Sequence, residues 1–398
     1  MLDTVNIKIT GSNSFYIDYR ENFSPEFKPR SYGELSETEK RPDKKVFYTA
    51  KFILKKGILE DEYQPRVEVY EDVDNEKREI NYVLKAEFSN SKLFNENSIM
   101  EISEHNQARI MEMLERKLRA CGIRLNGNRL PYATVGKVHF AKNIILPDDV
   151  LMINILDEFS KASMGKSYDI TKTKHTNTSE TLQHFCGSRD HSFYDKVKDI
   201  LRPQNKSNDK EKTSYEKELL YTFNLDKKSI FRYEYRLNRI ETIKSEINRF
   251  YKRPYTEAVL FKDLFNEALW KDLIVKSWDR IIRRPANQLA LKFSLEDSDV
   301  FKHMLVQSRQ GKKDGHSQNS ALISFGLAML VKKYGIAFIR SEYKKIWSDR
   351  ACGERLDKKV EEAEKLLEGL PYSDDITFVD QKMRAFERIT MDSLEKEV

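Results

Sequence analysis

The sequence predicts an α+β fold, in which an N-terminal antiparallel sheet carries helices on one face and is followed by a helical C-terminal domain. Segments with alternating apolar and polar residues recur through the first 253 residues and are interleaved with segments of helical spacing. Residues 256–398 show helical spacing and no convincing strand pattern. Lys252-Arg253-Pro254 is the favoured boundary, which divides the chain into domains 1–253 and 254–398.

The N-terminal half alternates strands with helices. The expected strands are residues 2–10, 45–54, 66–70, 80–89, 134–146 and 229–239. The expected helices are residues 104–121, 147–159, 211–222 and 241–251, with Gly122 as the stop signal of the first. The polar segments 14–44, 72–76, 171–179 and 203–210 are expected to be irregular. No glycine-rich phosphate loop follows a strand, so the opening is a meander and not a Rossmann start.

The C-terminal half is expected to consist of helices and a mixed tail. The predicted helices are residues 258–283, 296–308, 320–333, 339–349 and 354–368, with a polar connector at residues 309–319. Residues 321–331 and 339–347, joined at Lys333-Tyr334-Gly335, fit a helix-turn-helix and also fit a plain helical bundle.

Composition indicates a cytoplasmic protein with no membrane association. The 398 residues contain no apolar run of membrane-spanning length, and the N-terminus lacks a signal pattern. The three cysteines stand apart with no CxxC pair, which argues against a disulfide framework or a thiolate zinc site.

Positive charge is concentrated in the middle of the chain. Residues 161–260 hold 21 Lys and Arg against 14 Asp and Glu, an excess that accounts for the whole formal charge of +6. A clustered excess of cations favours a polyanionic partner such as DNA. A solvated basic surface without a specific partner fits the same excess equally well.

The segment 184–200 contains the strongest candidate chemistry. It runs through Gly187-Ser188-Arg189 to Tyr194-Asp195-Lys196, and a later strand, residues 231–237, has Glu234 at its centre. Together they supply a hydroxyl nucleophile, a cation to hold a phosphate and an acid. Lys196, two residues on, is expected to share the strand face of Tyr194, because side chains alternate with period two. Tyr-Asp-Lys triplets are common, and tyrosine also packs well in ordinary strands, so the triplet needs support from other segments.

That support comes from segments in the same order as in a known family. Residues 84–89 followed by Lys92-Leu93, residues 135–142, the tyrosine segment and residues 230–237 resemble the rolling-circle replication initiators of the phage and plasmid gene II/X family. The resemblance covers roughly residues 45–280 and is weak over the C-terminal helices. It implies a replication-initiator nuclease-like fold for domain 1–253, and for domain 254–398 a role in binding DNA or a partner.

The resemblance also implies roles for individual residues. Tyr194 and Lys196 would be catalytic, a divalent metal (Mg²⁺ or Mn²⁺) would be held by Glu87, His139 and Glu234, and Arg189, Arg232 and Arg236 would bind DNA. His139 stands where the family usually has aspartate; a neutral imidazole also binds such metals. This departure therefore leaves three readings open: a conserved role, a changed metal preference, or a structural histidine.

Other departures leave the nucleophile open. The interval from Arg189 to Tyr194 is shorter than in plasmid relatives, so a slipped register would make Tyr215 or Tyr233 the competing nucleophile. Tyr233 lies on the apolar face of its strand and Tyr215 begins a helix, so Tyr194 remains the favoured nucleophile. The His-x-His pair of HUH endonucleases is absent from the sequence, which argues against an ordinary relaxase.

The function implied is that of an initiator that nicks one DNA strand by tyrosine attack and later religates it. Its expected partners are single-stranded or supercoiled origin DNA, with host helicase and polymerase as further expected partners. Two alternatives remain open: a non-catalytic DNA-binding regulator of replication or transcription, and an RNA-binding module, although no aromatic stacking signature is visible.

Overall fold

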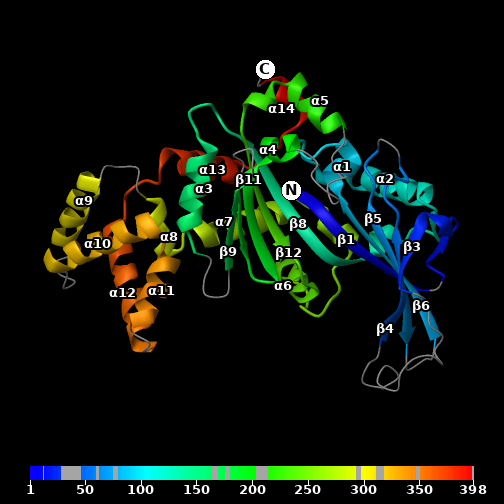
Figure 1. Cartoon of the computed structure of the whole chain (residues 1–398), viewed down its shortest axis with the longest axis horizontal. Helices are drawn as coiled ribbons and strands as arrows, with labels where there is room; N and C mark the ends of the chain where they lie inside the picture. The colour runs from blue at the N-terminus through cyan, green and yellow to red at the C-terminus, as the bar shows by residue number, and fades with distance from the viewer. Residues whose placement is uncertain are drawn as a thin grey trace.

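The structure is a computed structural model that describes residues 1–11, 13–27, 46–59, 62–74, 79–163, 169–174, 180–202, 214–292, 297–310, 318–346 and 350–396. Within these ranges a ten-stranded sheet dominates, and every pair of neighbouring strands is antiparallel (Figure 1). In spatial order the strands are β3 (Phe23–Phe27), β4 (Val46–Leu54), β5 (Arg66–Asp74), β6 (Glu79–Ser89), β1 (Leu2–Thr10), β8 (Thr134–Ile145), β12 (Ile230–Leu237), β11 (Arg189–Asp195), β10 (Glu180–Phe185) and β9 (Asp169–Lys174). Two short strands, β2 (Phe15–Ile17) and β7 (Ile123–Leu125), pair separately. The predicted α+β class is confirmed.

The two faces of the central strands differ in chemistry because side chains alternate along each strand. In β12, Arg232, Glu234 and Arg236 share one face. The other face of β12 is apolar and buried, and consists of Phe231, Tyr233, Tyr235 and Leu237. The expected position of Tyr233 on the apolar face is confirmed.

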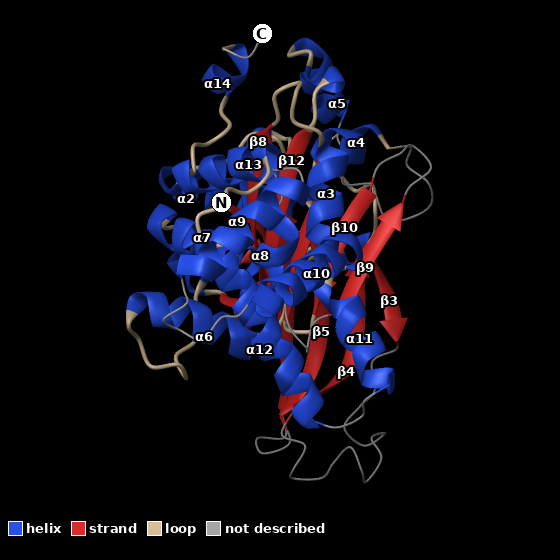
Figure 2. Ribbon diagram, turned by 90° about the vertical axis from the view of Figure 1, so that its left-hand side faces the viewer, coloured by secondary structure: helices blue, strands red, loops and turns tan. Residues whose placement is uncertain are grey.

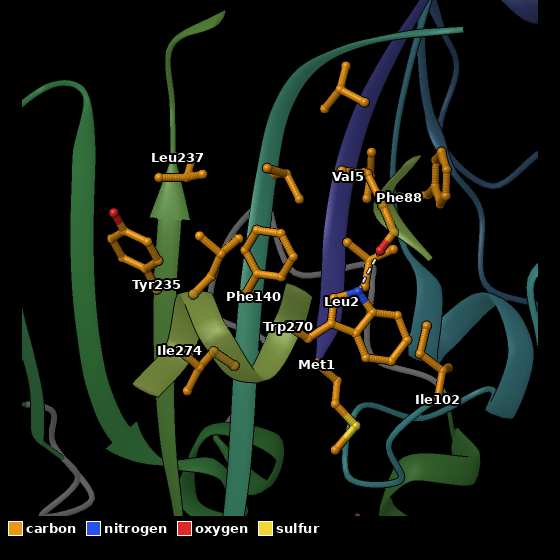
Figure 3. Packing of buried hydrophobic residues seen from close by; sticks show 14 of the residues in the cluster. Met1, Leu2, Val5, Phe88, Ile102, Phe140, Tyr235, Leu237, Trp270 and Ile274 are labelled. Carbon is orange, nitrogen blue, oxygen red and sulfur yellow. Dashed lines mark hydrogen bonds between the residues drawn. The ribbon is translucent and has the colours of Figure 1, made fainter. Parts of the chain in front are cut away.

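Helices cover the apolar face, as Figure 2 shows from the side. Helix α3 (Met152–Lys161) packs on β10 and β11, while α6 (Ile240–Tyr251), α7 (Glu267–Ile282) and α13 (Asp374–Ala385) pack on β8. Figure 3 shows this packing from close by; the labelled side chains include Leu2, Val5, Phe140, Tyr235, Trp270 and Ile274. Burial of this continuous apolar layer is the main stabilising contribution to the sheet.

Aromatic rings fill the centre of this layer. Phe159 of α3 stacks on Phe193 of β11 with ring centroids 5.0 Å apart, and Trp278 of α7 meets Phe159 and Tyr233 edge-on. Such offset and edge contacts add to the area that the rings bury. The helices therefore hold β11 and β12 firmly from one side, which leaves their polar face free to form a site.

Helix α2 (Gln107–Ala120) illustrates how the sequence sets an element. Its buried residues include Ile110, Leu114 and Leu118, at helical spacing, and the turn before it is capped by Ser103. Gly122 follows the helix at φ +92°, a conformation that favours glycine. The predicted helix 104–121 and its stop are confirmed.

Four local expectations were wrong. Residues 15–17 and 23–27, within the segment 14–44 that was expected to be irregular, form β2 and β3. Residues 171–174, expected to be a polar loop, belong to β9; this edge strand alternates Thr and Lys, so it lacks an apolar face that the sequence could reveal. Residues 72–74, expected in a turn, extend β5. The single expected helix 258–283 is a 3₁₀ turn, Phe261–Leu264, followed by α7. Within residues 203–213, expected to be a turn and a helix start, no residue is described.

The C-terminal helices contribute to more than one core. Helices α7 and α13 bury residues in the same core as the sheet. A second core is formed by α8 (Pro285–Leu291), α9 (Asp297–Gln310), α10 (Gln318–Tyr334), α11 (Ile336–Ile346), α12 (Arg350–Leu366) and the turn that follows α12. Helices α9 to α12 lie together at one end of the molecule in Figure 1. The division at residue 253 remains a prediction, and α7 and α13 show that the sheet's core draws on both sides of it.

Helices α10 and α11 meet at Gly335, where the chain bends sharply. Gly335 has φ +78°, and a Cβ there would lie 3.0 Å from the backbone of Lys161. No single helix in the described ranges is long and apolar enough to cross a membrane; the pair Ala321–Tyr334 and Ile336–Ile346, bent by 111°, reaches that length and apolarity only when its members are taken together.

Three buried histidines predict a loss of stability in mild acid. Burial lowers the pKa of His184 to about 4 and that of His139 to about 3, and holds the pKa of His191 well below its ordinary value. An unfolded histidine titrates near ~6.5, so below that pH the unfolded chain binds protons that the folded protein does not. This contribution to the free energy of unfolding is complete above about pH 6.5 and is lost as the pH falls towards about 4.

Urea unfolding at about pH 7 and about pH 4.5 measures this loss. The His184→Phe variant keeps a ring against Phe193 and should lose less of its urea midpoint between the two pH values than the parent protein. The exposed His105 supplies the control, and His105→Phe should behave as the parent does. Equal losses in all three proteins would show that burial of His184 does not couple folding to pH.

Candidate active site

A pocket of about 480 Å³ lies on the polar face of the sheet, where β6, β1, β8, β12 and β11 run side by side. Helix α1 (Asn90–Asn95), the segment after it and helix α4 (Lys196–Leu201) supply further lining residues, and Tyr63 and Arg66, before and at the start of β5, supply the rest. Seven of the eight residues predicted for the site line this pocket: Glu87, His139, Tyr194, Lys196, Arg232, Glu234 and Arg236. The structure thus brings together segments that lie up to 149 residues apart in the sequence, from Glu87 to Arg236.

The eighth residue, Arg189, lies on the opposite face of the sheet. Its position in β11 is five residues before Tyr194, so alternation directs the two side chains to different faces. Arg189 donates to Glu246 of α6 at 2.9 Å, on the helix-covered side. It therefore does not share the pocket with the other two predicted arginines.

Tyr194 lies near the end of β11, directly before a change from strand to helix. Asp195 accepts hydrogen bonds from the backbone amides of Val197 and Lys198 at 3.0 and 3.4 Å and so caps α4. Lys196 is therefore the first residue of a helix, and the expectation that it shares Tyr194's strand face was wrong. Its ammonium still lies 5.8 Å from the centre of the Tyr194 ring and 2.9 Å from Asp199.

The Tyr194 hydroxyl donates to Oε1 of Glu234 at 2.6 Å. Burial is the main cause that raises the pKa of Tyr194 above its ordinary value, and the Glu234 carboxylate adds to the effect. Burial alone would also raise the pKa of Glu234, but Arg236 and Arg232 hold it well below its ordinary range. In this arrangement the tyrosine keeps its proton and the glutamate is charged.

Arg232 lies at the floor of the pocket and is surrounded by acceptors. Its Nε donates to Glu234 at 2.7 Å, and its Nη2 lies 2.7 Å from Oδ2 of Asp3. Its Nη1 donates to the carbonyl of Ser98 and to Oδ1 of Asn143, both at 3.1 Å. Only 4% of the Arg232 side chain is exposed. Each nitrogen of this guanidinium is paired with an acceptor inside the protein, so Arg232 acts as an internal anchor and is poorly placed for its predicted contact with DNA.

Arg236 lies at the rim of the same pocket. Its side chain is 28% exposed, and its Nε and Nη2 both donate to Oε2 of Glu234, at 2.8 and 2.5 Å. Among the described side chains, only Glu234 forms a hydrogen bond or ion pair with this guanidinium. Of the three predicted arginines, Arg236 is the one placed to meet a ligand in the pocket.

The three predicted metal ligands all line the pocket, and two of them are paired with cations. Both oxygens of Glu234 accept from the two arginines or Tyr194, and Glu87 lies 3.7 Å from Lys137 and 4.0 Å from Arg66. His139 fits a ligand's role better, since its pKa of about 3 keeps it neutral and its buried Nε2 has no hydrogen-bond partner. Throughout the described ranges, no three His, Cys, Asp or Glu side chains are grouped to hold an ion.

Nine lining residues were not among the predicted site residues, and four of them are charged. The charged ones are Asp3, Arg66, Lys92 and Asp199. Asp3 follows Leu2 in β1, and the pairing of β1 with β8 shifts register between Leu2 and Val5. Such a bulge interrupts simple alternation, so Asp3 and Thr4 both line the pocket. The signal available in the sequence was an acid near the start of an otherwise apolar and alternating strand.

The competing tyrosines lie elsewhere. Tyr233 is fully buried on the apolar face, where its hydroxyl donates to Ser277 at 2.8 Å and contacts Nδ1 of His191. Tyr215 lies on α5 (Ser214–Thr222) and does not line the pocket. The second tyrosine in the lining is Tyr63, whose hydroxyl accepts from the Ser89 amide at 2.7 Å. Tyr194 is thus the lining tyrosine that is bonded to the central carboxylate.

Comparisons with known proteins return no relative: no protein-family model, no curated protein and no solved structure matches the chain.

The two pocket arginines should differ in their contribution to stability. Arg232→Ala would leave the carboxylates of Asp3 and Glu234 buried without their shared cation, and it should lower the free energy of unfolding by about 3–5 kcal/mol. Arg236→Ala removes a partly exposed partner while Arg232 still pairs with Glu234, so its effect should be clearly smaller. Urea unfolding of both variants tests this, and equal losses would contradict the anchor role of Arg232.

Proposed function

We propose that the protein is a DNA-nicking enzyme of the replication-initiator type, in which Tyr194 attacks a phosphodiester and becomes linked to the 5′ end of the cut strand. The observation that carries this proposal is the Tyr194 hydroxyl, bonded at 2.6 Å to a buried carboxylate in a pocket that also contains Lys196 and Arg236. A hydroxyl nucleophile, a proton acceptor and cations for a phosphate are the groups that phosphoryl transfer to a protein requires.

The proposed step moves one proton and exchanges one bond to phosphorus. The Tyr194 oxygen gives its proton to Oε1 of Glu234 and forms a bond to phosphorus as the bond to the 3′ oxygen breaks. The departing 3′ oxygen takes a proton from water, and Glu234 later returns its proton to solvent. The products are a 5′-phosphotyrosyl protein and a free 3′-hydroxyl, and the reverse step rejoins a strand without an external energy source.

Lys196 and Arg236 have distinct proposed roles in this step. The Lys196 ammonium lies close to the Tyr194 ring and lowers the cost of a negative charge on its oxygen. Arg236, at the rim, suits a phosphate because a guanidinium can donate two parallel hydrogen bonds to it.

A divalent metal, which the family resemblance implies, would polarise the phosphate as a Lewis acid. The carboxylates that were expected to hold it, Glu87 and Glu234, are paired with cations in this structure. The proposed step is therefore confined to the chain's own side chains.

Mass spectrometry of the protein after reaction with a single-stranded oligonucleotide library tests the proposal. A covalent adduct is expected on the peptide that contains Tyr194. Tyr194→Phe removes one oxygen, keeps the packing of the ring, and should abolish both nicking and the adduct while DNA binding is retained.

Tyr215→Phe and Tyr63→Phe are the matched controls, and both should still form the adduct. An adduct on the Tyr63 or Tyr215 peptide would keep the enzyme class and move the nucleophile. DNA binding without cleavage, unchanged by Tyr194→Phe, would instead favour a non-catalytic DNA-binding regulator.

A further inference from the structure

We propose that the open side of the pocket is a binding site for one phosphate-type anion, and that Arg236 changes partner there, leaving Glu234 for the anion. The inference rests on the proposed function and specifies how the ligand engages the site. Binding of the anion to Arg236 would thereby change the hydrogen bonding of Glu234, the carboxylate that accepts from the Tyr194 hydroxyl.

The charge of the pocket is the first argument. Five cationic side chains line it against four carboxylates; the cations are Arg66, Lys92, Lys196, Arg232 and Arg236, and the acids are Asp3, Glu87, Asp199 and Glu234. Lys137 and Glu216, which pair with this set from outside the lining, add one charge of each sign. His139 is neutral. The excess of one positive charge matches a single phosphodiester.

The geometry of the two arginines is the second argument. Arg232 is 4% exposed and bonded on all sides, whereas Arg236 is 28% exposed and bonded only to Glu234 among the described residues. The Arg236 bonds to Glu234 use the same paired N–H groups that a phosphate would accept. A phosphate can therefore replace the carboxylate at Arg236 without any change at Arg232.

The exchange has a consequence for Glu234. When Arg236 leaves, Oε1 of the carboxylate keeps the Nε of Arg232 and the Tyr194 hydroxyl, while Oε2 loses its hydrogen-bond partner. The departure of this cation and the negative charge of the anion both make Glu234 a better acceptor for the Tyr194 proton.

Binding of inorganic phosphate in EDTA, followed by ³¹P NMR titration, tests the site without DNA and without cleavage. The parent protein should bind phosphate, and Arg236→Gln should bind it at least about tenfold more weakly, since a charge-assisted pair is lost. The matched control is Arg249→Gln, because Arg249 also donates at 2.5 Å to a buried glutamate, Glu246, but lies outside the pocket. This control should bind phosphate as the parent does.

A second NMR measurement follows the change of partner at Arg236 directly. The Nε–H signal of Arg236, assigned by its loss in Arg236→Gln, should shift on addition of phosphate, while that of Arg232 should stay in place. Equal phosphate affinity in the parent and Arg236→Gln, or an Arg236 signal that does not move, would overturn the inference.

The outcomes also separate this inference from the proposed function. Phosphate binding that depends on Arg236 in a protein that forms no adduct with DNA would leave the anion site standing and remove the nickase. An adduct on Tyr194 in a protein whose phosphate binding does not involve Arg236 would support the nickase and remove the anion site at Arg236.

Discussion

The buried guanidinium of Arg232 is the interaction on which the polar side of this structure depends. It joins Glu234 of its own strand, Asp3 of β1, Asn143 of β8 and the carbonyl of Ser98, so four segments converge on one charge. A buried ion is tolerated only when its partners satisfy it. Each of these partners is therefore fixed in place by the need to satisfy Arg232, and the floor of the pocket is as firmly determined as a packed apolar core.

The two faces of the central strands support each other. The aromatic layer beneath β11 and β12 holds their backbones, and this rigidity fixes the polar side chains on the opposite face. Ala141, directly opposite Glu234 in the β8–β12 ladder, leaves room beside the carboxylate that a larger side chain would fill. A site on rigid strands keeps the Tyr194–Glu234 contact short without help from a mobile loop.

Alternation explains both what the sequence could predict and what it could not. The period of two placed Arg232, Glu234 and Arg236 on one face, and the order of the segments brought Tyr194, Glu87 and His139 to the same pocket. The same rule, applied to the odd separation of Arg189 and Tyr194, would have put Arg189 on the other face. The place of Asp3 in the pocket could not be predicted, because a bulge interrupts the alternation of β1. The helical position of Lys196 could not be predicted either, because Asp195 caps a helix that ends the alternation of β11.

The ionic pairing of the pocket also explains why Tyr194 keeps its proton. Glu234 is flanked by two arginines, so it is a weak base, and Tyr194 is buried, so it is a weak acid. The pKa of neither group can change while the surrounding charges stay the same. Arg232 cannot provide the change, because its release would leave Asp3 and Glu234 facing each other as buried anions. The charge balance can shift at the exposed rim, so in the proposed reaction the group that enters there must bring its own charge into the pocket to activate Tyr194.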